Sequence, residues 1–517
     1  MAHRNSVLLA FAVTVGLAGG STEANAENVA AWSVPALREW QAEPGFFMLS
    51  AKSRIVVSKR DNIGLRTEAE MLQHDIREIS GERLPLIIGK PRPGDILLSL
   101  GPEVPEKEGY RIAVHDQIDI LASTATGVFY GGQTLLQLLK HTVDRHTVPR
   151  GAATDYPLIA MRSVMIDTGR HYYQVDQIDE LLRDMAWKKL NTLHLHFTDW
   201  PAFRLDSDKF PGLAPAGASY NRKDIGHILE TARRNHILVV PEVDFPAHST
   251  ALIKYRPALA FACDSMQRSE WMDTADVDPA TKGWTVDITK DANRRFLRDV
   301  LTEFIAWFDG PYFHVGGDEY EYDEKKARCP EIVQTAKDKG YVYAGDLFVD
   351  FINEMDGVVK ASGKKTVIWN WWRFKDDKTS IEPEKDIIIE VWNSPRQKEI
   401  LESGYEVIIS PEDILYVTPG IIPSKENDFY GHVDIRKVYE DMAFTKDASI
   451  RGYELGIWSD SAGNQTDQFF FGAAYQPIAV VADKTWGGVA SPNADAFLKR
   501  LNLVGNPPSA EFRPYQR

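Results

Sequence analysis

The sequence predicts an α/β protein in which a (β/α)8 TIM barrel follows a small N-terminal α/β domain made of a sheet and helices. After residue 150, an apolar strand-like segment, a polar or acidic residue at its C-terminal end and a helical segment recur in eight successive units. That order is typical of a parallel barrel surrounded by helices. A doubly wound open sheet is the competing architecture, but the first strand lacks the glycine-rich phosphate turn that such sheets carry.

The charge balance narrows the class of ligand. The 517 residues carry a formal net charge of −15, and no basic cluster interrupts the acidic excess. A protein of this charge is a poor match for a nucleic acid or another polyanion. We therefore expect a neutral or small-molecule ligand and no nucleic-acid partner.

Residues 1–26 are predicted to be a secretory signal peptide. His3 and Arg4 precede the apolar run 7–17, and Ala-Asn-Ala at 24–26 supplies the small residues of a cleavage site. The run is short for a bilayer crossing, and no later segment approaches the roughly 20 continuous apolar residues that a membrane helix needs. We expect an exported protein, periplasmic or extracellular, that begins near Glu27 and has no membrane contact after cleavage. A retained N-terminal anchor is the alternative.

Residues 27–150 are predicted to form the small α/β domain, with a structural role. Short apolar runs punctuated by Gly and Pro predict strands, and helical spacing of apolar residues predicts helices. The strands are expected at 55–57, 86–88, 96–100, 110–114 and 118–121, and the helices at 67–79 and 131–139. The polar, turn-rich segment 145–157 marks the boundary, and the barrel is expected to occupy residues 151–517.

The barrel elements place a set of polar and aromatic residues at one face. Strands are expected at 162–167, 191–199, 237–244, 312–319, 366–370, 387–392, 406–410 and 453–459, and helices at 175–189, 224–235, 291–308, 345–361 and 465–482. In such barrels the functional groups lie at the C-terminal strand ends and in the following loops. Aromatic faces and polar groups gathered at one mouth suit a sugar. The residues at those ends are Asp167, Asp199, Asp244, His248, Asp318, Glu319, Asn370, Trp392, Tyr416, Trp458 and Asp460.

The fourth strand leads into two glycines and two adjacent carboxylates, Asp318 and Glu319. The glycines remove side chains that would keep a ligand away from the backbone. Because neighbouring carboxylates repel each other, one of them is expected to stay protonated and to serve as a general acid. The alternative is a strand followed by an acidic helix start, where Asp and Glu are also favoured.

Several segments, in order, resemble the signatures of one family. The chain carries Asp-Thr-Gly-Arg-His-Tyr at 167–172, Leu-His-Leu-His at 193–196, Pro-Glu-Val-Asp-Phe-Pro-Ala-His at 241–248 and His-Val-Gly-Gly-Asp-Glu at 314–319. Together they resemble glycoside hydrolase family 20, the β-N-acetylhexosaminidases. Glu-Gly-Tyr at 108–110 extends the resemblance into the small domain. It implies an enzyme that acts on carbohydrate and needs neither cofactor nor metal.

The resemblance also implies roles for the acids and their neighbours. This family is a substrate-assisted exception among retaining glycosidases, in which the substrate's 2-acetamido oxygen acts as nucleophile. Glu319 would be the general acid and base, and Asp318 would hold the acetamido group. Tyr416 resembles the tyrosine that orients the acetamido oxygen. Asp199 and His248 resemble the pair that lies behind the acid.

Sugar-binding residues are expected around these acids. Arg162 resembles the arginine that takes hydroxyls in the terminal subsite, although it stands at the start of the first strand. Trp369, Trp372, Trp392 and Trp458 are candidates for the pocket wall, with Trp392 and Trp458 favoured, and any single tryptophan is more often a core residue. Asp460 takes the place of a family glutamate.

His194 and His196 permit a rival interpretation. Two histidines on one strand face have metal-ligand spacing, and metal-dependent barrel hydrolases use such a pair. In those enzymes the pair normally ends the first strand, whereas here it lies within the second. We expect a core or hydrogen-bonded role, because the carboxylates provide a complete mechanism without metal.

Two further features stay open at the level of the sequence. Cys263 and Cys329 are the two cysteines, and in an oxidising compartment they permit one disulfide or two free thiols. Thr418, Ile435 and Asp460 depart from the family pattern around the far sugar hydroxyls. These departures leave the choice between GlcNAc and GalNAc open, and they make a sugar-binding barrel without turnover the alternative function. The linkage and the oligomeric state are not indicated.

Overall fold

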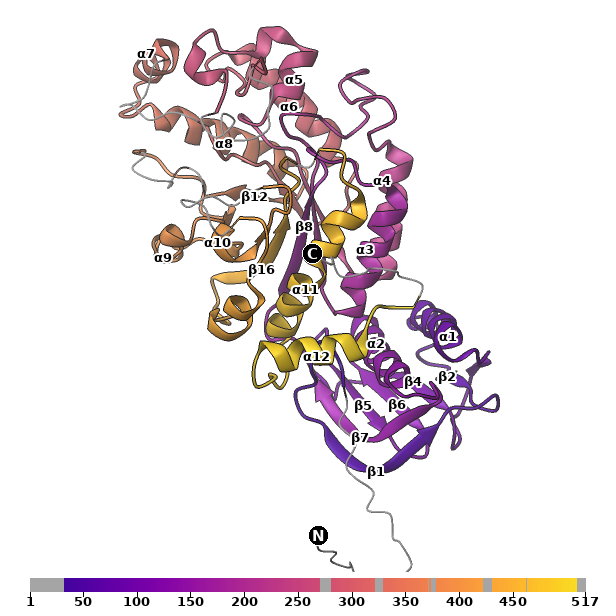
Figure 1. Cartoon of the computed structure of the whole chain (residues 1–517). Helices are drawn as coiled ribbons and strands as arrows, with labels where there is room; N and C mark the ends of the chain where they lie inside the picture. Colours follow the sequence, from indigo (N-terminus) through magenta and orange to yellow (C-terminus); the bar gives the residue numbers. More distant parts are fainter. Residues whose placement is uncertain are drawn as a thin grey trace, which may run out of the picture.

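The computed structural model describes residues 32–269, 280–320, 329–370, 372, 378–421, 430–461 and 463–508. The predicted signal peptide lies outside these residues. Figure 1 shows two units, a helix-surrounded barrel and a smaller sheet domain at its base. The two-unit α/β architecture predicted from the sequence is confirmed.

The small domain is a seven-stranded sheet with the order β1-β7-β5-β6-β4-β2-β3. Two helices pack against it, and Gly131 allows the second to approach closely, because a Cβ there would lie 2.6 Å from the side chain of Ile120. The elements are β1 Gln41–Met48, β2 Ile55–Val57, α1 Arg66–Ser80, β3 Leu86–Ile88, β4 Ile96–Leu100, β5 Tyr110–Val114, β6 Ile118–Ala122, α2 Ala125–His141 and β7 Thr147–Asp155.

The expected domain boundary requires a correction. The segment 145–157 is not a turn-rich linker, because most of it forms β7, which pairs antiparallel with both β1 and β5. Gly151, Ala152 and Ala153 have little strand propensity of their own, so pairing on both edges decides their conformation. The small domain therefore extends to Asp155, beyond the expected end at residue 150.

The larger unit is a closed barrel of eight parallel strands. β16 pairs with both β8 and β14, which joins the two ends of the sheet. The strands are β8 Met161–Asp167, β9 Thr192–His196, β10 Leu238–Glu242, β11 Tyr312–His314, β12 Lys365–Trp369, β13 Ile388–Val391, β14 Val407–Ile409 and β16 Ile450–Ile457, and the short β15 Tyr416–Val417 pairs with β16. The helices are α3 Val175–Trp187, α4 Arg222–Arg234, α5 Thr250–Tyr255, α6 Asp291–Ile305, α7 Pro330–Asp338, α8 Gly345–Ala361, α9 Gln397–Glu402, α10 Glu412–Leu415, α11 Asp467–Trp486 and α12 Ala494–Val504.

Several strands end earlier than the sequence predicts. β11 was expected to continue to Glu319 but ends at His314, because Gly316 and Gly317 have φ values of 68° and 94°, outside the range of a strand. β9 and β10 likewise end before Asp199 and Asp244. Asp199, Asp244, Asp318 and Glu319 therefore lie on the loops above the barrel strands, whereas Asp167 is the last residue of β8.

The barrel interior is filled in layers. The lower layer is apolar and contains Met161, Val240, Val367, Ile388 and Ile408. The middle layer is ionisable and buried, with His194, Glu242, His314, Glu390 and Glu454. The upper layer is aromatic, with Trp369, Tyr416 and Trp458 over Met165. The barrel is thus a packed core whose polarity changes sharply just below its mouth.

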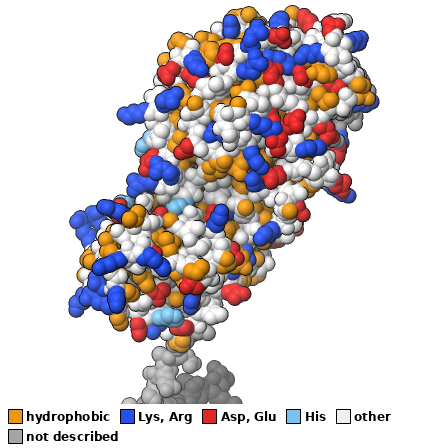
Figure 2. All heavy atoms as spheres, turned by 180° about the vertical axis from the view of Figure 1, so that it is seen from behind, with side chains coloured by type: hydrophobic (Ala, Val, Ile, Leu, Met, Phe, Trp, Pro, Cys, Tyr) orange, Lys and Arg blue, Asp and Glu red, His pale blue; other side chains and the backbone are white. Residues whose placement is uncertain are grey.

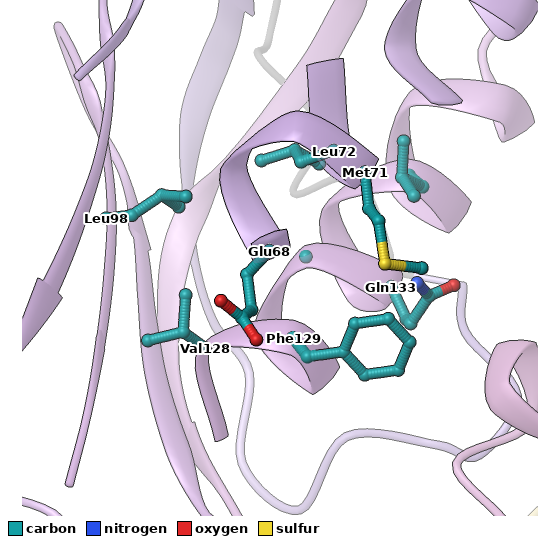
Figure 3. Close-up of a pocket in the computed structure, with 9 residues that line it drawn as sticks. Glu68, Met71, Leu72, Leu98, Val128, Phe129 and Gln133 are labelled. Atoms are coloured by element: carbon teal, nitrogen blue, oxygen red, sulfur yellow. The ribbon is translucent and has the colours of Figure 1, made fainter. Parts of the chain in front are cut away.

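Contacts between the two units are specific and buried. α12 at the end of the described chain packs on α2 of the small domain (Figure 1). Glu68 on α1 points into a small, mostly apolar cavity beside Phe129 and Gln133 (Figure 3). Its carboxylate lies 3.2 Å from Nε2 of His236, which follows α4 of the barrel. The small domain is therefore attached to the base of the barrel, away from the mouth.

Charges are spread over the surface. On the face in Figure 2, acidic and basic side chains are interspersed over the barrel, and basic ones gather at the outer edge of the small domain. None of the helices in the described part of the chain combines the length and the apolar character that a bilayer crossing requires.

Candidate active site

The glycine turn after β11 places two carboxylates at the barrel mouth. The main-chain N–H of Gly317 donates to Oδ1 of Asp244, 2.9 Å away. Gly316 has no room for a side chain, because a Cβ would lie 1.7 Å from that same oxygen. The turn leaves the side chains of Asp318 and Glu319 15% and 23% exposed, respectively. Both acids therefore face the opening while their backbone is fixed from below.

His248 connects these acids to a buried carboxylate. Its Nε2 lies 3.4 Å from both Asp318 Oδ2 and Glu319 Oε2, and its Nδ1 lies 3.1 Å from both oxygens of Asp199. Burial disfavours a charged ring, but the carboxylates of Asp199 and Asp318 outweigh it and hold the pKa of His248 well above its usual value. The geometry thus brings Asp199, His248, Asp318 and Glu319 together, as the resemblance implied.

Arg170, rather than Arg162, is the arginine at the mouth. It follows β8 and its guanidinium contacts three carboxylates: Asp167 at 2.9 Å, Asp199 at 3.0 Å and Asp460 at 3.3 Å. Burial raises the pKa of Asp460 to about 6, although Arg170 opposes the shift. This cluster places a fixed positive charge at the mouth, beside carboxylates that can accept hydrogen bonds from hydroxyl groups.

Arg162 was expected to bind sugar, and the structure corrects that assignment. It is fully buried at the N-terminal end of β8, where it forms a bidentate ion pair with Glu108 of the small domain at 2.9 and 3.0 Å. Its Nε donates to the main-chain oxygen of Lys189. Because it lies at the opposite end of β8 from the mouth, Arg162 fastens the two domains together.

An aromatic floor lies beneath the carboxylates. Trp369, Tyr416 and Trp458 pack together over Met165, and Trp392 borders them. Burial raises the pKa of Tyr416 well above its usual value, and nearby carboxylates add to the shift. Its phenol therefore keeps its proton and can donate a hydrogen bond to a ligand.

The remaining tryptophan candidates differ in their surroundings. The indole N–H of Trp369 donates to Oε1 of Glu242 at 2.8 Å, which anchors this ring from the ionisable layer below. Trp372 is buried and packs edge-on against Tyr405, with ring centroids 5.7 Å apart. Trp369 therefore belongs to the aromatic layer at the barrel mouth, and Trp372 belongs to the core.

Trp284 is a further residue of the site, and it is not among those predicted from the sequence. Its ring lies 4.2 Å from the ring of His248, and its indole N–H donates to the main-chain oxygen of Glu319 at 3.3 Å. It thereby fixes Glu319, whose φ of 51° is unusual for a residue other than glycine. Trp284 lies in a loop between α5 and α6, and no strand-end rule points to it.

The positions that depart from the family pattern have identifiable partners. Oγ1 of Thr418 accepts a hydrogen bond from the main-chain N–H of Gly431 at 2.6 Å and is buried. Ile435 packs against the apolar core. Asp460 remains at the mouth through Arg170.

His194 and His196 contact carboxylates through both of their ring nitrogens. His194 lies 2.9 Å from Glu454 and 3.0 Å from Glu242, and His196 lies 2.5 Å from Glu242 and 3.1 Å from Asp199. The pair thus belongs to a buried network of imidazoles and carboxylates. Through Asp199, this network reaches His248.

Cys263 and Cys329 are joined by a disulfide. The bond connects the segment that follows α5 with the residue that precedes α7. Both segments flank the loops that carry Trp284 and Glu319.

Comparison with known families identifies the chain. Residues 160–488 match the family described as "Glycosyl hydrolase family 20, catalytic domain", and residues 33–156 match "Glycosyl hydrolase family 20, domain 2". The chain belongs to glycoside hydrolase family 20. The two matches meet close to the end of β7, where the structure places the domain boundary.

Individual relatives carry related names. A "Beta-hexosaminidase" of Porphyromonas gingivalis is 27% identical over 499 residues, which cover 88% of this chain and 60% of that protein. A "Lacto-N-biosidase" of Bifidobacterium bifidum is 24% identical over 502 residues, which cover 93% of this chain and 42% of that protein. The chain thus spans less than two thirds of the length of either relative.

Solved structures share the fold. The β-N-acetylhexosaminidase from Bacteroides fragilis superimposes with a TM-score of 0.75 at 21% sequence identity, and the match covers 92% of this chain and 94% of that one. The likeness therefore extends over both the small domain and the barrel.

Proposed function

We propose that this chain is a retaining β-N-acetylhexosaminidase that removes terminal, non-reducing, β-linked N-acetylhexosamine, GlcNAc or GalNAc, from oligosaccharides or glycoconjugates. The observation that carries the proposal is the pair Asp318 and Glu319 around His248 at the mouth, above an aromatic floor. Family membership and the names of the relatives support it.

The proposed reaction is substrate-assisted. The 2-acetamido oxygen of the substrate attacks the anomeric carbon, while Glu319 gives a proton to the departing oxygen and later takes one from the attacking water. Asp318 accepts the acetamido N–H and stabilises the positive charge of the oxazolinium intermediate. Two successive displacements at one carbon retain its configuration.

The neighbouring groups have supporting roles in this scheme. Tyr416 donates to the acetamido oxygen, and Trp369, Trp392 and Trp458 enclose its methyl group and the sugar ring. His248, backed by Asp199, stabilises negative charge on the two acids. Arg170 and Asp460 lie where the sugar's far hydroxyls would bind.

The test is hydrolysis of aryl β-N-acetylglucosaminide and β-N-acetylgalactosaminide by the wild type, Glu319→Gln and Asp318→Asn. Because general acid–base catalysis typically contributes about 10²–10⁴-fold, we expect a loss of kcat/KM in that range for Glu319→Gln. NMR of the first-formed product should show the β-anomer. An inverted product, or sugar binding with no hydrolysis by the wild type, would contradict the proposal; the latter is expected of a sugar-binding barrel.

We further propose that the protein is exported. The basic residues, apolar run and small-residue site at positions 1–26 support this, and so does a disulfide between Cys263 and Cys329, because such bonds persist in oxidising compartments. Cell fractionation with an antibody to the barrel should find the protein outside the cytoplasm, and a cytoplasmic location would contradict export.

A further inference from the structure

The carboxyl group of Asp244 has no role in the scheme above, yet it lies directly beneath the catalytic turn. The main-chain N–H of Asp244 donates a hydrogen bond to Thr198 Oγ1 at 2.7 Å, and Asp244 Oδ1 accepts one from the N–H of Gly317. The residue is 1% exposed. Asp244 is therefore held rigidly, with one oxygen committed to the turn that carries Asp318.

The second oxygen of Asp244 lies beside Asp318. Polar atoms of Asp244, His248 and Asp318 lie within 4.8 Å of one another, so the carboxyl groups of Asp244 and Asp318 are neighbours. Oδ2 of Asp244 and Oδ1 of Asp318 are both buried, and neither meets an N–H or hydroxyl donor among the described residues. Two carboxyl groups can hydrogen-bond each other only when one of them carries a proton.

The surrounding charges decide which carboxyl group carries it. Two ionised carboxylates buried this close together would repel each other, because little solvent screens their charges. Asp318 has the imidazole of His248 at 3.4 Å, whereas Asp244 makes no ion pair with a basic side chain in the described part of the chain. The other titratable groups that act on Asp244 are His248 and His196, which lower its pKa, and Glu242, which raises it. Burial and Asp318 together raise the pKa of Asp244 well above its usual value, whereas the pKa of Asp318 is lowered despite its burial, mainly by His248.

We propose that Asp244 is a positioning residue, a neutral carboxylic acid that donates its proton in a hydrogen bond to Asp318 and so fixes the Asp318 carboxylate toward the substrate's acetamido group. This inference deepens the proposed function and rests on it. An ionised Asp318 held in this way keeps lone pairs free to accept the acetamido N–H. Because the Asp244 donor is neutral, it adds no charge to the site. Loss of the donor would let the carboxylate rotate toward His248 and away from the substrate.

The kinetic test compares Asp244→Asn with Asp244→Ala on an aryl β-N-acetylglucosaminide. Asparagine keeps the acceptor for Gly317 N–H and offers an amide N–H to Asp318, so we expect a loss of kcat within about tenfold. Alanine removes both the acceptor for Gly317 N–H and the donor to Asp318. We therefore expect kcat to fall by about 100-fold, with a smaller change in KM, because losses of this order follow when a group that orients a catalytic residue is removed. Equal losses in two folded variants, or no loss in Asp244→Ala, would overturn the proposal.

The pH dependence of kcat/KM and the infrared spectrum are two further measurements, and neither would change if Asp244 had only a structural role. In the wild type, deprotonation of Asp244 removes the donor, so kcat/KM falls at alkaline pH; in Asp244→Asn that fall should shift to higher pH.

The infrared difference between wild type and Asp244→Asn at neutral pH should contain the C=O stretch of a protonated carboxyl group. Because this spectrum needs no turnover, it tests Asp244 even if the wild type hydrolyses no aryl hexosaminide. A spectrum with only carboxylate bands would overturn the proposal.

Discussion

Arg170 and Arg162 show how position on a strand decides the role of a residue. Both guanidinium groups are buried and paired with carboxylates, and they lie at opposite ends of β8. Arg170 contacts Asp199 and Asp460 at the mouth, and Arg162 contacts Glu108 between the domains. Identical side chains therefore hold carboxylates at the mouth at one end of the strand and join the two domains at the other.

Replacement of each arginine by methionine should separate the two roles. Arg162→Met leaves Glu108 without its charged partner, and breaking such a buried ion pair typically costs about 3–5 kcal/mol, so we expect a lower Tm with KM unchanged. Arg170→Met should raise KM for an aryl β-N-acetylglucosaminide by at least about tenfold, as expected when a charged hydrogen-bonding partner is lost. Thermal denaturation and steady-state kinetics measure both. A larger effect on KM from Arg162→Met would contradict the assignment.

Among the elements, the turn that follows β11 carries most of the site. The three-residue strand is followed by Val315 and by two glycines with positive φ, and the next two residues are the acids. The close approach of Gly316 to Asp244 leaves no space for any other residue. The length of β11 is thus set by the requirements of the site.

Gly316→Ala tests this element against a matched control. At Gly316 an added Cβ would meet Asp244, so we expect a loss of activity of at least about 100-fold, because small displacements of reacting groups carry costs of that order. Gly340 also has a positive φ, 76°, but open space around it, so Gly340→Ala should cost only backbone strain of about 1 kcal/mol and leave kcat unchanged. Equal kinetic effects of the two substitutions would contradict a steric role for Asp244.

The sequence was sufficient for the barrel, for the order of its strands and for the residues around His248, because strand ends of a parallel barrel converge by geometry. It was insufficient where a residue acts from a loop, as Trp284 does, or where pairing with distant strands overrides local propensity, as in β7. Arg170 was present in a recognised motif, and the strand-end rule would have selected it over Arg162. The protonated partner of Asp318 could not be predicted, since it depends on which carboxyl group His248 approaches.

At the scale of the whole molecule, a buried ionisable layer ties the barrel strands together. His194 on β9 contacts Glu242 on β10 and Glu454 on β16, and His314 on β11 contacts Glu242. Burial lowers the pKa of His194, but Glu454 and Glu242 outweigh it and raise the pKa to about 9. Charge within this layer therefore contributes to the stability of the entire barrel.

The stability should depend on pH in a direction set by His194. A folded-state pKa near 9, against about 6.5 in the unfolded chain, contributes on the order of 3 kcal/mol that is fully present below pH 6.5 and is lost as pH rises through about 9. Thermal unfolding of wild type and His194→Gln from pH 6 to 10 should show a Tm difference that narrows with rising pH. A difference that widens over this range would contradict the charge state inferred for the layer.

The most direct test of the central claim is the rate of hydrolysis of aryl β-glucosaminides whose N-acetyl group carries zero, one, two or three fluorines. Fluorine withdraws electrons from the acetamido oxygen, which is the nucleophile in the proposed reaction. We expect kcat/KM to fall steeply and monotonically along the series. A rate that is independent of fluorination would contradict substrate assistance and would require a nucleophile from the protein.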